Sequence, residues 1–501
     1  MKRRLISVSL TVLLIICALA ACGEASAPAQ GTSAPSADAP ASGGDAAAAE
    51  TTAELNESEF DPLPERDMGG FKLRFYNYDD SWLTWAIMTM DADSENGDNV
   101  NDAIYRRNRR VEDKYNCEIS ETLVKNTNDD IKKIVMSGDD LYEIMFVYDE
   151  LCASDYCAGL ITTWDRMTYV DSSHSWWSQN AIDVFSLKGK QFAAVGDLSL
   201  GMATRGFVLL FNKELYKSID GAPDLYDAVR DSSWTIDTFA SVCKDFARDL
   251  NGDGVMDDKD MWPTTGAVKL HFGSLVTGAG VKYIDLNSDG DPYFAIPGNE
   301  YAMNVFEKIF KVHDGTNIYY SLVGDVHNGS NESRVIFKEG RQLFQGTSTK
   351  AIETYRDCDF DIGIIPYPKY ETSQESYHVL TSGTGVLTIP ATLPDDRFEN
   401  VSILIDALAR DSHYDLLPTY REVVLKTKYS RDEDSAEMLD IIFNAGTFDL
   451  GLSIWPDVTY YKYMESYLKM KDDFASLTEK QASAVQGKID KLLEALAESE
   501  G

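Results

Sequence analysis

The order of hydrophobic and polar positions predicts strands and helices that alternate along most of the chain. Residues 71–75 (FKLRF) predict the first strand of the folded part. Ile104, Val111 and Tyr115 recur at helical spacing with several arginines between them, which predicts a helix from residue 101. The pattern continues with strands at 117–120, 142–148, 206–211, 360–365 and 385–389, and helices at 129–136 (ended by residues 137–140), 236–249, 301–313 and 398–410.

This alternation favours parallel or mixed sheets wrapped by helices, an α/β fold class. The C-terminal stretch at 459–499 predicts helix throughout. No repeat with a period of about 20 to 50 residues is evident, so a solenoid or propeller is not expected.

The N-terminus has the pattern of an export signal. Lys2, Arg3 and Arg4 precede an apolar run that starts at Leu5 and closes with the sequence LAAC, ending at Cys22. This arrangement matches a lipobox, so we expect residues 1–21 to be a lipoprotein signal peptide and the Cys22 thiol to carry the lipid. The alternative is a retained transmembrane anchor, for which the run is short compared with a span of about 20 residues.

The segment after Cys22 predicts a tether. Residues 23–59 consist almost entirely of small, polar and acidic residues with Leu55 as the one large apolar side chain, and such a segment cannot offset its ordering entropy by burial. We therefore expect residues 22–65 to form a disordered tether and the folded part to start near Arg66. The remaining 435 or so residues exceed what one core usually organises, which favours two lobes.

Charge and cysteine content narrow the possible partners. The chain has 46 Lys and Arg against 82 Asp and Glu, and after loss of the basic leader the net charge is about −39. Nucleic acid is therefore not an expected partner, and the membrane is expected to be reached through the lipid alone. Of the cysteines beyond Cys22, none has a metal-ligand spacing; Cys152 and Cys157 either pair locally or remain free thiols.

The common catalytic motifs are missing. The sequence has no GxSxG elbow, no HExxH and no Walker loop, and the glycines at 278 and 280 lack the third glycine of a dinucleotide loop. We therefore expect no enzyme and no organic cofactor. A pair of carboxylates spaced for glycoside hydrolysis remains an alternative, because carboxylates abound.

One loop has the spacing of a calcium site. Oxygen ligands at positions 1, 3, 5, 7, 9 and 12, with Gly254 at position 6, are what an EF-hand loop requires. Position 12 is an aspartate in place of the bidentate glutamate, so the predicted structural Ca²⁺ would bind weakly; the alternative is an Asx-turn loop without metal. The predicted ligands are Asp249, Asn251, Asp253, Val255 (through its carbonyl), Asp257 and Asp260. The similar loop at 285–296 predicts a hairpin turn.

Several segments together resemble a known family. They are, besides the lipobox and tether, residues 101–119 (NDAIYRRNRRVEDKYNCEI), 137–148 (SGDDLYEIMFVY), 208–215 (VLLFNKEL), 234–235 (WT) and 360–369 (FDIGIIPYPK). In order and spacing they resemble the extracellular solute-binding proteins of ABC importers, family 1, the maltose-binding-protein-like sugar-binding group. The likeness runs over most of residues 66–470, and no single segment is diagnostic.

The resemblance implies a two-lobed periplasmic-binding-protein-like fold of type II, in which each lobe is a mixed sheet flanked by helices and is built from discontinuous segments. Lobe 1 would comprise 66–207 and 371–412, and lobe 2 would comprise 208–370 and 413–501. Strands ending near residue 213 and near residues 364–370 would cross between the lobes. A ligand clamped between them would shift the population toward closure, and the protein would act as a monomer.

The resemblance also implies ligand-binding residues by position. They are Tyr148, Asp149 and Glu150 after a strand, Thr204 and Arg205 before the crossing, Thr347 and Ser348 where related sugar binders present an aromatic ring, and Trp455 and Asp457 before the C-terminal helices.

Sugar recognition needs flat apolar faces together with carboxylates, amides and arginine for the hydroxyls. The tryptophans supply such faces: Trp82, Trp85, Trp176, Trp177, Trp234, Trp262 and Trp455. Trp455 is the preferred stacking candidate. The adjacent pair Trp176 and Trp177 is a second, because it lies in a polar loop where two large rings are hard to bury together.

These observations predict a lipid-anchored receptor that delivers a carbohydrate to the permease subunits of an ABC transporter, on the outer face of the cell membrane or in a periplasm. Two alternatives remain open. One is a receptor of the same fold for a peptide or another polar solute, and the other is a secreted glycoside hydrolase.

Overall fold

The computed structural model describes residues 63–498 apart from 80, 82, 84, 139, 322–329, 382 and 426–432. The predicted signal peptide, the predicted lipidation site Cys22, nearly all of the tether and Trp82 lie outside the described residues. The described residues all belong to one compact unit. Among these residues, no helix is both long enough and apolar enough to span a bilayer.

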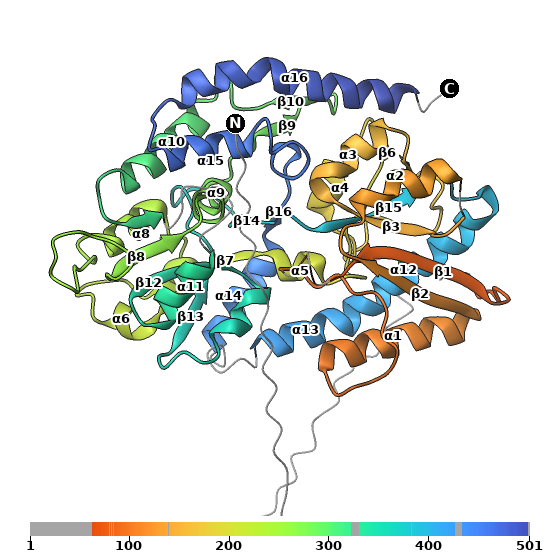
Figure 1. Ribbon diagram of the computed structural model, residues 1–501, viewed down its shortest axis with the longest axis horizontal. Coiled ribbons are helices and arrows are strands. Elements are labelled where there is room, and N and C mark those ends of the chain that lie inside the picture. Colours follow the sequence, from red (N-terminus) through yellow and green to blue (C-terminus); the bar gives the residue numbers. More distant parts are fainter. Residues whose placement is uncertain are drawn as a thin grey trace, which may run out of the picture. The chain divides into compact units, whose positions relative to one another are not determined.

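Two five-stranded mixed sheets organise this unit, and we name the sheets with their packed helices lobe 1 and lobe 2 (Figure 1). The lobe 1 sheet has the order β2-β1-β3-β15-β4, in which β1 pairs in parallel with β2 and β3 while β15 runs antiparallel to β3 and β4. Its strands are β1 (Phe71–Tyr78), β2 (Cys117–Val124), β3 (Ile144–Tyr148), β4 (Ile161–Thr162) and β15 (Gly385–Pro390).

The lobe 2 sheet has the order β11-β8-β12-β7-β13. Strand β8 pairs in parallel with β11 and β12, whereas β7 runs antiparallel to β12 and β13. Its strands are β7 (Phe207–Asn212), β8 (Trp262–Gly266), β11 (Tyr319–Ser321), β12 (Gln342–Ser348) and β13 (Ile362–Ile365). Short strand pairs lie outside both sheets: β5 (Ser186–Leu187) with β6 (Lys190–Gln191), β9 (Ile284–Leu286) with β10 (Pro292–Phe294), and β14 (Val379–Leu380) with β16 (Gly446–Thr447).

The helices cover the faces of the two sheets. Those of the lobe 1 part are α1 (Asn99–Tyr115), α2 (Asn128–Ser137), α3 (Asp149–Cys157), α4 (Gln179–Phe185), α5 (Gly201–Arg205), the 3₁₀ turn η3 (Asp395–Arg397), α12 (Phe398–Tyr414) and α13 (Leu416–Leu425). Those of the lobe 2 part are α6 (Lys213–Lys217), α7 (Leu225–Arg230), α8 (Ile236–Cys243), α9 (Val268–Gly278), α10 (Glu300–His313), α11 (Ser330–Lys338), η2 (Lys350–Tyr355), α14 (Glu433–Asn444), η4 (Leu450–Ile454), α15 (Tyr460–Leu468) and α16 (Phe474–Glu498).

Local sequence explains why these elements form where they do. Helix α1 starts at Asp98, whose carboxylate accepts the backbone N–H groups of Val100 and Asn101, and it ends at Asn116 in the left-handed conformation. Its buried face includes Ile104, Val111 and Tyr115, the three positions that carried the helical spacing.

Two predicted helices are shorter than expected. The helix predicted at 236–249 ends at Cys243, because Lys244 is extended and Asp245 has a φ of 58°. The predicted continuous C-terminal helix is broken between α15 and α16, where Met470 has a φ of 47°.

The predicted hairpin at 285–296 is confirmed as the antiparallel pair β9 and β10.

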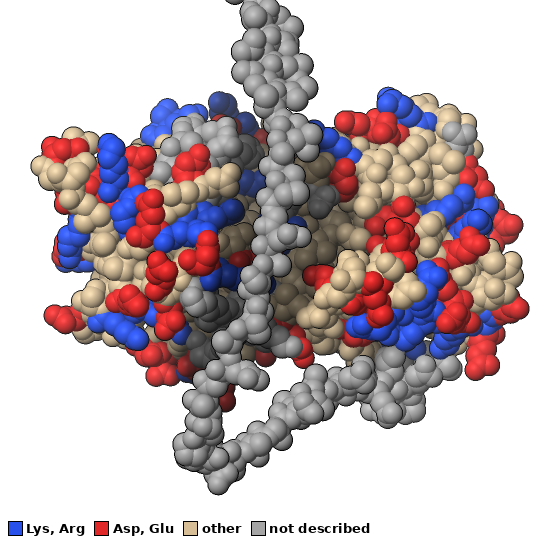
Figure 2. Space-filling view, turned by 60° about the horizontal axis from the view of Figure 1, so that its bottom comes forward, with Lys and Arg blue, Asp and Glu red and all other residues tan. Residues whose placement is uncertain are grey.

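The chain passes between the sheets at the points that position the site. It leaves lobe 1 after α5 and enters β7, returns between β13 and β15, and leaves again after α13, which packs on α1 and α12. We group α13 with lobe 1 because it packs on α1 and α12, whereas the predicted boundary at residue 413 placed it in lobe 2; the exact lobe boundaries remain a prediction. On the face in Figure 2, acidic and basic side chains are interspersed over both lobes.

The cysteines Cys117, Cys152, Cys157, Cys243 and Cys358 are free thiols, so the local Cys152–Cys157 disulfide does not form.

Candidate functional site

The centre of the site is the point where β3 runs directly into α3. Asp149, the first residue of α3, is fully buried, and its Oδ2 accepts the Gly383 N–H at 2.9 Å while its Oδ1 accepts the Glu150 N–H at 3.0 Å. Its own N–H donates to the Thr384 carbonyl at 3.0 Å. Burial, with the nearby Glu150 charge as the next cause, raises the pKa of Asp149 to about 7. Asp149 therefore ties the end of β3 to the segment that returns from lobe 2.

Glu150 connects lobe 1 to lobe 2. The Tyr461 hydroxyl on α15 donates to Glu150 Oε1, and Lys269 Nζ, on the first turn of α9, lies 4.0 Å from the same oxygen. Lys269 Nζ also donates to the Tyr461 hydroxyl oxygen at 2.7 Å. Burial lowers the pKa of the Lys269 ammonium, although Glu150 opposes this shift. One carboxylate of lobe 1 is thus held by two side chains of lobe 2.

Arg205 stands beside this contact at the end of α5. It is buried, and burial lowers the pKa of its guanidinium, with Tyr148 and Asp149 acting in the opposite direction. The guanidinium carbon lies 4.7 Å from the centre of the Phe207 ring and 5.9 Å from that of Trp85. A cationic side chain and aromatic faces therefore meet at the point where the chain crosses between the lobes.

Gly383 allows these side chains to approach one another. It has a φ of +74°, and a Cβ there would lie 2.6 Å from the Tyr148 hydroxyl and 3.2 Å from Arg205 Nη2. The Gly383 carbonyl accepts the Trp85 indole N–H at 2.9 Å. We call Trp85, Tyr148, Asp149, Glu150, Arg205, Lys269, Gly383, Tyr460 and Tyr461 the inter-lobe cluster.

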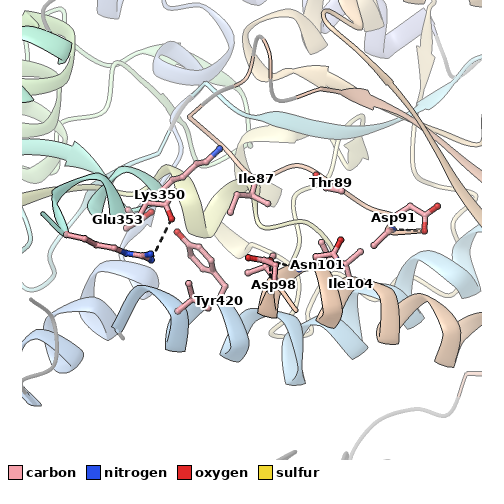
Figure 3. Close-up of a pocket in the computed structure, with 14 residues that line it drawn as sticks. Ile87, Thr89, Asp91, Asp98, Asn101, Ile104, Lys350, Glu353 and Tyr420 are labelled. Carbon is pink, nitrogen blue, oxygen red and sulfur yellow. Dashed lines mark hydrogen bonds and ion pairs between the residues drawn. The ribbon is translucent and has the colours of Figure 1, made fainter. Parts of the chain in front are cut away.

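A cavity of about 330 Å³ is lined by residues of both lobes (Figure 3). Lobe 1 lines it with residues between Ile87 and Ile104, and lobe 2 lines it with residues of η2; Tyr420 of α13 stands between Glu353 and Asp98. Lys350 Nζ donates to the Ala86 carbonyl at 3.0 Å, next to Trp85 of the cluster. Ile87, which lines the cavity, is thus two residues along the chain from Trp85 of the cluster.

The structure brings four of the predicted ligand residues together: Tyr148, Asp149, Glu150 and Arg205. Thr204 is adjacent and buried, and its hydroxyl oxygen accepts the Ile87 N–H at 3.1 Å. Thr347 and Ser348 are buried at the end of β12, where they pair with Val208 and Phe207 of the crossing strand. They support the crossing from the lobe 2 side.

Lys269, Tyr460, Tyr461 and Gly383 were not predicted to contribute to the site, and Trp85 was one of seven tryptophans considered as a sugar-stacking face. Lys269 was missed because it lies on the first turn of α9, just after β8, and the sequence analysis did not predict β8. Tyr460 and Tyr461 lie in the stretch predicted as helix, and no local signal sets them apart; Tyr460 packs over Gly273, and its hydroxyl donates to the Lys269 carbonyl.

Trp176 and Trp177 require a correction, because they do not form an exposed sugar platform. Both are buried in the lobe 1 core, and both indole N–H groups donate to Asp406 Oδ1, at 2.9 and 3.1 Å. One buried carboxylate of α12 thus satisfies both rings, and Arg410, 3.5 Å from Asp406, balances its charge. The expectation that two adjacent tryptophans are hard to bury together is therefore wrong here.

Trp455 and Asp457 lie on a different side of Glu150. Trp455 is 4% exposed and packs in a cluster with residues of α3, and Asp457 Oδ2 lies 3.3 Å from Lys488 Nζ of α16. Both residues border a second cavity, of about 320 Å³, that also reaches Glu150. Their role in ligand binding remains a prediction.

The loop at 249–260 is closed by its own carboxylates. Asp249 accepts the N–H groups of Gly252 and Gly254 at 2.7 and 2.8 Å, and the buried Asp260 accepts those of Leu250 and Asp257 at 2.9 and 2.8 Å. These contacts fit an Asx-turn loop as well as a calcium loop. Within the described part of the chain, no group of three or more His, Cys, Asp or Glu side chains is arranged to hold a metal ion. Calcium binding remains a prediction.

Comparisons with known proteins identify the fold. No protein-family model matches the sequence, and no curated protein matches it. Three of the similar solved structures each cover 84% of this chain. The GacH receptor of Streptomyces glaucescens, solved unliganded and with acarbose, has a TM-score of 0.52, 12% identity and 99% of its own length covered.

The second structure is a cyclic alpha-maltosyl-1,6-maltose binding protein from Arthrobacter globiformis, with a TM-score of 0.53 and 13% identity. The third is a family 1 extracellular solute-binding protein from Bifidobacterium longum subsp. infantis, with a TM-score of 0.53 and 11% identity. The alignment covers 99% of the length of each of these two proteins. All three are described as receptors or binding proteins. At these identities the likeness concerns the fold. It confirms the predicted two-lobed, type II periplasmic-binding-protein fold and the resemblance to family 1 extracellular solute-binding proteins at that level.

Proposed function

We propose that this protein is the solute receptor of an ABC importer and that it binds a carbohydrate between its two lobes. The inter-lobe cluster is the observation that carries the proposal. It combines the aromatic rings of Trp85, Tyr148 and Tyr461 with the charged groups of Glu150 and Arg205, drawn from both lobes. Rings suit the C–H face of a sugar, and carboxylate and guanidinium groups suit its hydroxyls.

Closure of the lobes on a ligand follows from this arrangement. Glu150 of lobe 1 contacts Tyr461 and Lys269 of lobe 2 directly. When the lobes are further apart, a ligand with several hydroxyl groups can lie between Glu150 and these two side chains and bond to both lobes. Only a ligand that gains contacts with both lobes shifts the population toward the closed form. The solute is bound and released without chemical change.

The N-terminal sequence gives this receptor a location. A lipid on Cys22 and the tether at 22–65 would hold a monomeric receptor near its permease subunits at the outer face of the membrane, or on the periplasmic side where there are two membranes. Tethering raises the effective concentration of receptor at the transporter without any new contact.

Thermal unfolding of the full chain with millimolar mono- and oligosaccharides tests the proposal. A sugar at about 100 times its dissociation constant stabilises the folded state by about 2.7 kcal/mol. Tyr461→Phe removes the hydroxyl that faces Glu150 and should weaken sugar binding by roughly tenfold, equivalent to about 1.4 kcal/mol. Tyr301→Phe, which removes a hydroxyl bonded to the Ala279 carbonyl on the lobe 2 surface, is the matched control.

If no sugar changes the melting temperature, the carbohydrate proposal is wrong. A receptor for a peptide or another polar solute is then the next candidate, and the buried Arg205 and the partly buried Lys269 support it. Arg205 and Lys269 lie close to Asp149 and Glu150, so the cluster offers both signs of charge to an ionised ligand. A glycoside hydrolase would require turnover that one Asp or Glu replacement abolishes.

A further inference from the structure

Helix α16 rests on both lobes. At its N-terminal end Phe474 packs against Phe306 of α10, with ring centroids 5.4 Å apart, and the Thr478 hydroxyl lies 2.6 Å from that of Tyr463 in α15. Both contacts belong to lobe 2. Figure 1 shows the helix continuing from α10 and α15 towards α3 of lobe 1.

The C-terminal half of α16 packs on lobe 1. Val485, Ile489, Leu492 and Leu496 are at most 2% exposed and recur at intervals of three and four residues, so they form one apolar stripe. The stripe belongs to the same cluster as Cys152, Ala153 and Tyr156 of α3, and the Lys491 carbonyl lies 3.8 Å from Cys157 Sγ. The helix thus joins two bodies that a solute receptor must be able to move apart.

Two features allow this contact to be released. The cavity of about 320 Å³ lies between α3, η4 and α16, and its polar lining includes Ser154, Asp457, Lys488 and Lys491, so part of the interface is not closely packed. Gly487 lies between the two halves, is exposed, and would have nothing within 4 Å of an added Cβ. Packing does not require a glycine there, yet glycine weakens a helix interior by about 1 kcal/mol relative to alanine.

We propose that α16 is a strap that limits the opening of the lobes. Its N-terminal half stays with lobe 2, its C-terminal stripe is docked on α3 of lobe 1, and full opening requires the stripe to detach, with a bend near Gly487. The strap acts without ligand, so the proposal does not depend on the nature of the solute. It sets how far the unliganded lobes separate, and therefore how fast a ligand can leave.

Hydrogen exchange of the unliganded full chain, followed by mass spectrometry, tests the strap. Ile489→Asp places a charge in the docked stripe, and we expect amide exchange in α3 and residues 485–498 to become at least about tenfold faster. Exchange at residues 383–385, in the inter-lobe cluster, should also accelerate, while α10 stays unchanged. Ala484→Asp, at an exposed position of the same helix, is the control and should change neither region.

The exchange at residues 383–385 decides the outcome. If Ile489→Asp releases α16 while exchange there is unchanged, α16 is a passive packing helix and the proposal is overturned. Gly487→Ala tests it independently, because the open surroundings accept the added methyl group without strain. This variant should slow exchange both in the stripe and at 383–385, and unchanged rates would refute the bend at Gly487.

Discussion

Replacement of Asp149 by asparagine should remove a large part of the pH dependence of stability. The pKa of this buried carboxyl is about 7 in the folded protein against its ordinary value of 3.8, because burial penalises its charge. A difference of about 3 pH units corresponds to about 4 kcal/mol at 1.36 kcal/mol per unit. Asp149 therefore makes the free energy of unfolding depend on pH by an amount of this order.

The sign follows from the raised pKa. Between about pH 4 and about pH 7 the folded state keeps a proton that the unfolded state has lost, so the stability from this group is greatest at low pH and is lost as the pH rises through this window. The slope is about 1.4 kcal/mol per pH unit. Asp149→Asn cannot ionise, and its free energy of unfolding should lack this slope.

Urea unfolding followed by tryptophan fluorescence, from about pH 4 to about pH 8 at constant ionic strength, measures the effect. The quantity of interest is the difference between wild type and variant, because Glu121 and Asp449 also have a pKa of about 7 through burial and affect both proteins equally. Asp183→Asn, at an exposed position of α4, is the control and should run parallel to wild type. Parallel curves for Asp149→Asn would refute the raised pKa.

Three further predictions concern other parts of the chain. Asp406→Ala leaves two buried indole N–H groups without their acceptor and should lower the free energy of unfolding by about 3 kcal/mol. The control Glu399→Ala, at an exposed ion pair, should lower it by less than about 1 kcal/mol. Equal losses for the two variants in chemical denaturation would contradict the shared hydrogen bonds to Asp406. Gly383→Ala forces a Cβ to within 2.6 Å of the Tyr148 hydroxyl at positive φ, so we expect a loss of about 1 to 3 kcal/mol and weaker ligand binding in a titration, and an unchanged protein would argue against the close approach. If the loop at 249–260 binds calcium, chelator should lower the melting temperature and added Ca²⁺ should restore it, whereas no response to chelator would leave an Asx-turn loop.

Local sequence predicted the order of elements well, because the signals for a helix or a strand lie within a few residues of one another. The helical spacing of Ile104, Val111 and Tyr115 and the cap at Asp98 are both contained in one short segment, and α1 forms there. The predicted helix ends were wrong where a single residue with a left-handed backbone conformation ends the helix. The left-handed residues Asp245 and Met470 end helices that the hydrophobic pattern alone would continue.

The sequence prediction included Glu150 but not the two lobe 2 side chains that hold it, Tyr461 and Lys269. Tyr148 ends a buried strand and Asp149 and Glu150 follow it, so their place in the fold could be predicted from the chain, while their role in ligand binding was implied by the family resemblance. Their partners could not, because Tyr461 is 311 residues from Glu150, and no periodicity connects positions so far apart.

The sequence by itself determined the alternation of strands and helices, the residues at the end of β3, and the predicted export signal, because each of these depends on neighbouring residues. Only the tertiary structure decided which charges and rings meet. The sequence suggested Trp176 as a sugar-stacking residue, but in the structure its indole N–H donates to Asp406, 230 residues away, in the core. Lys269 and Tyr461 became site residues only when the two sheets placed them beside Glu150, since burial and pairing depend on contacts that the folded chain alone brings together.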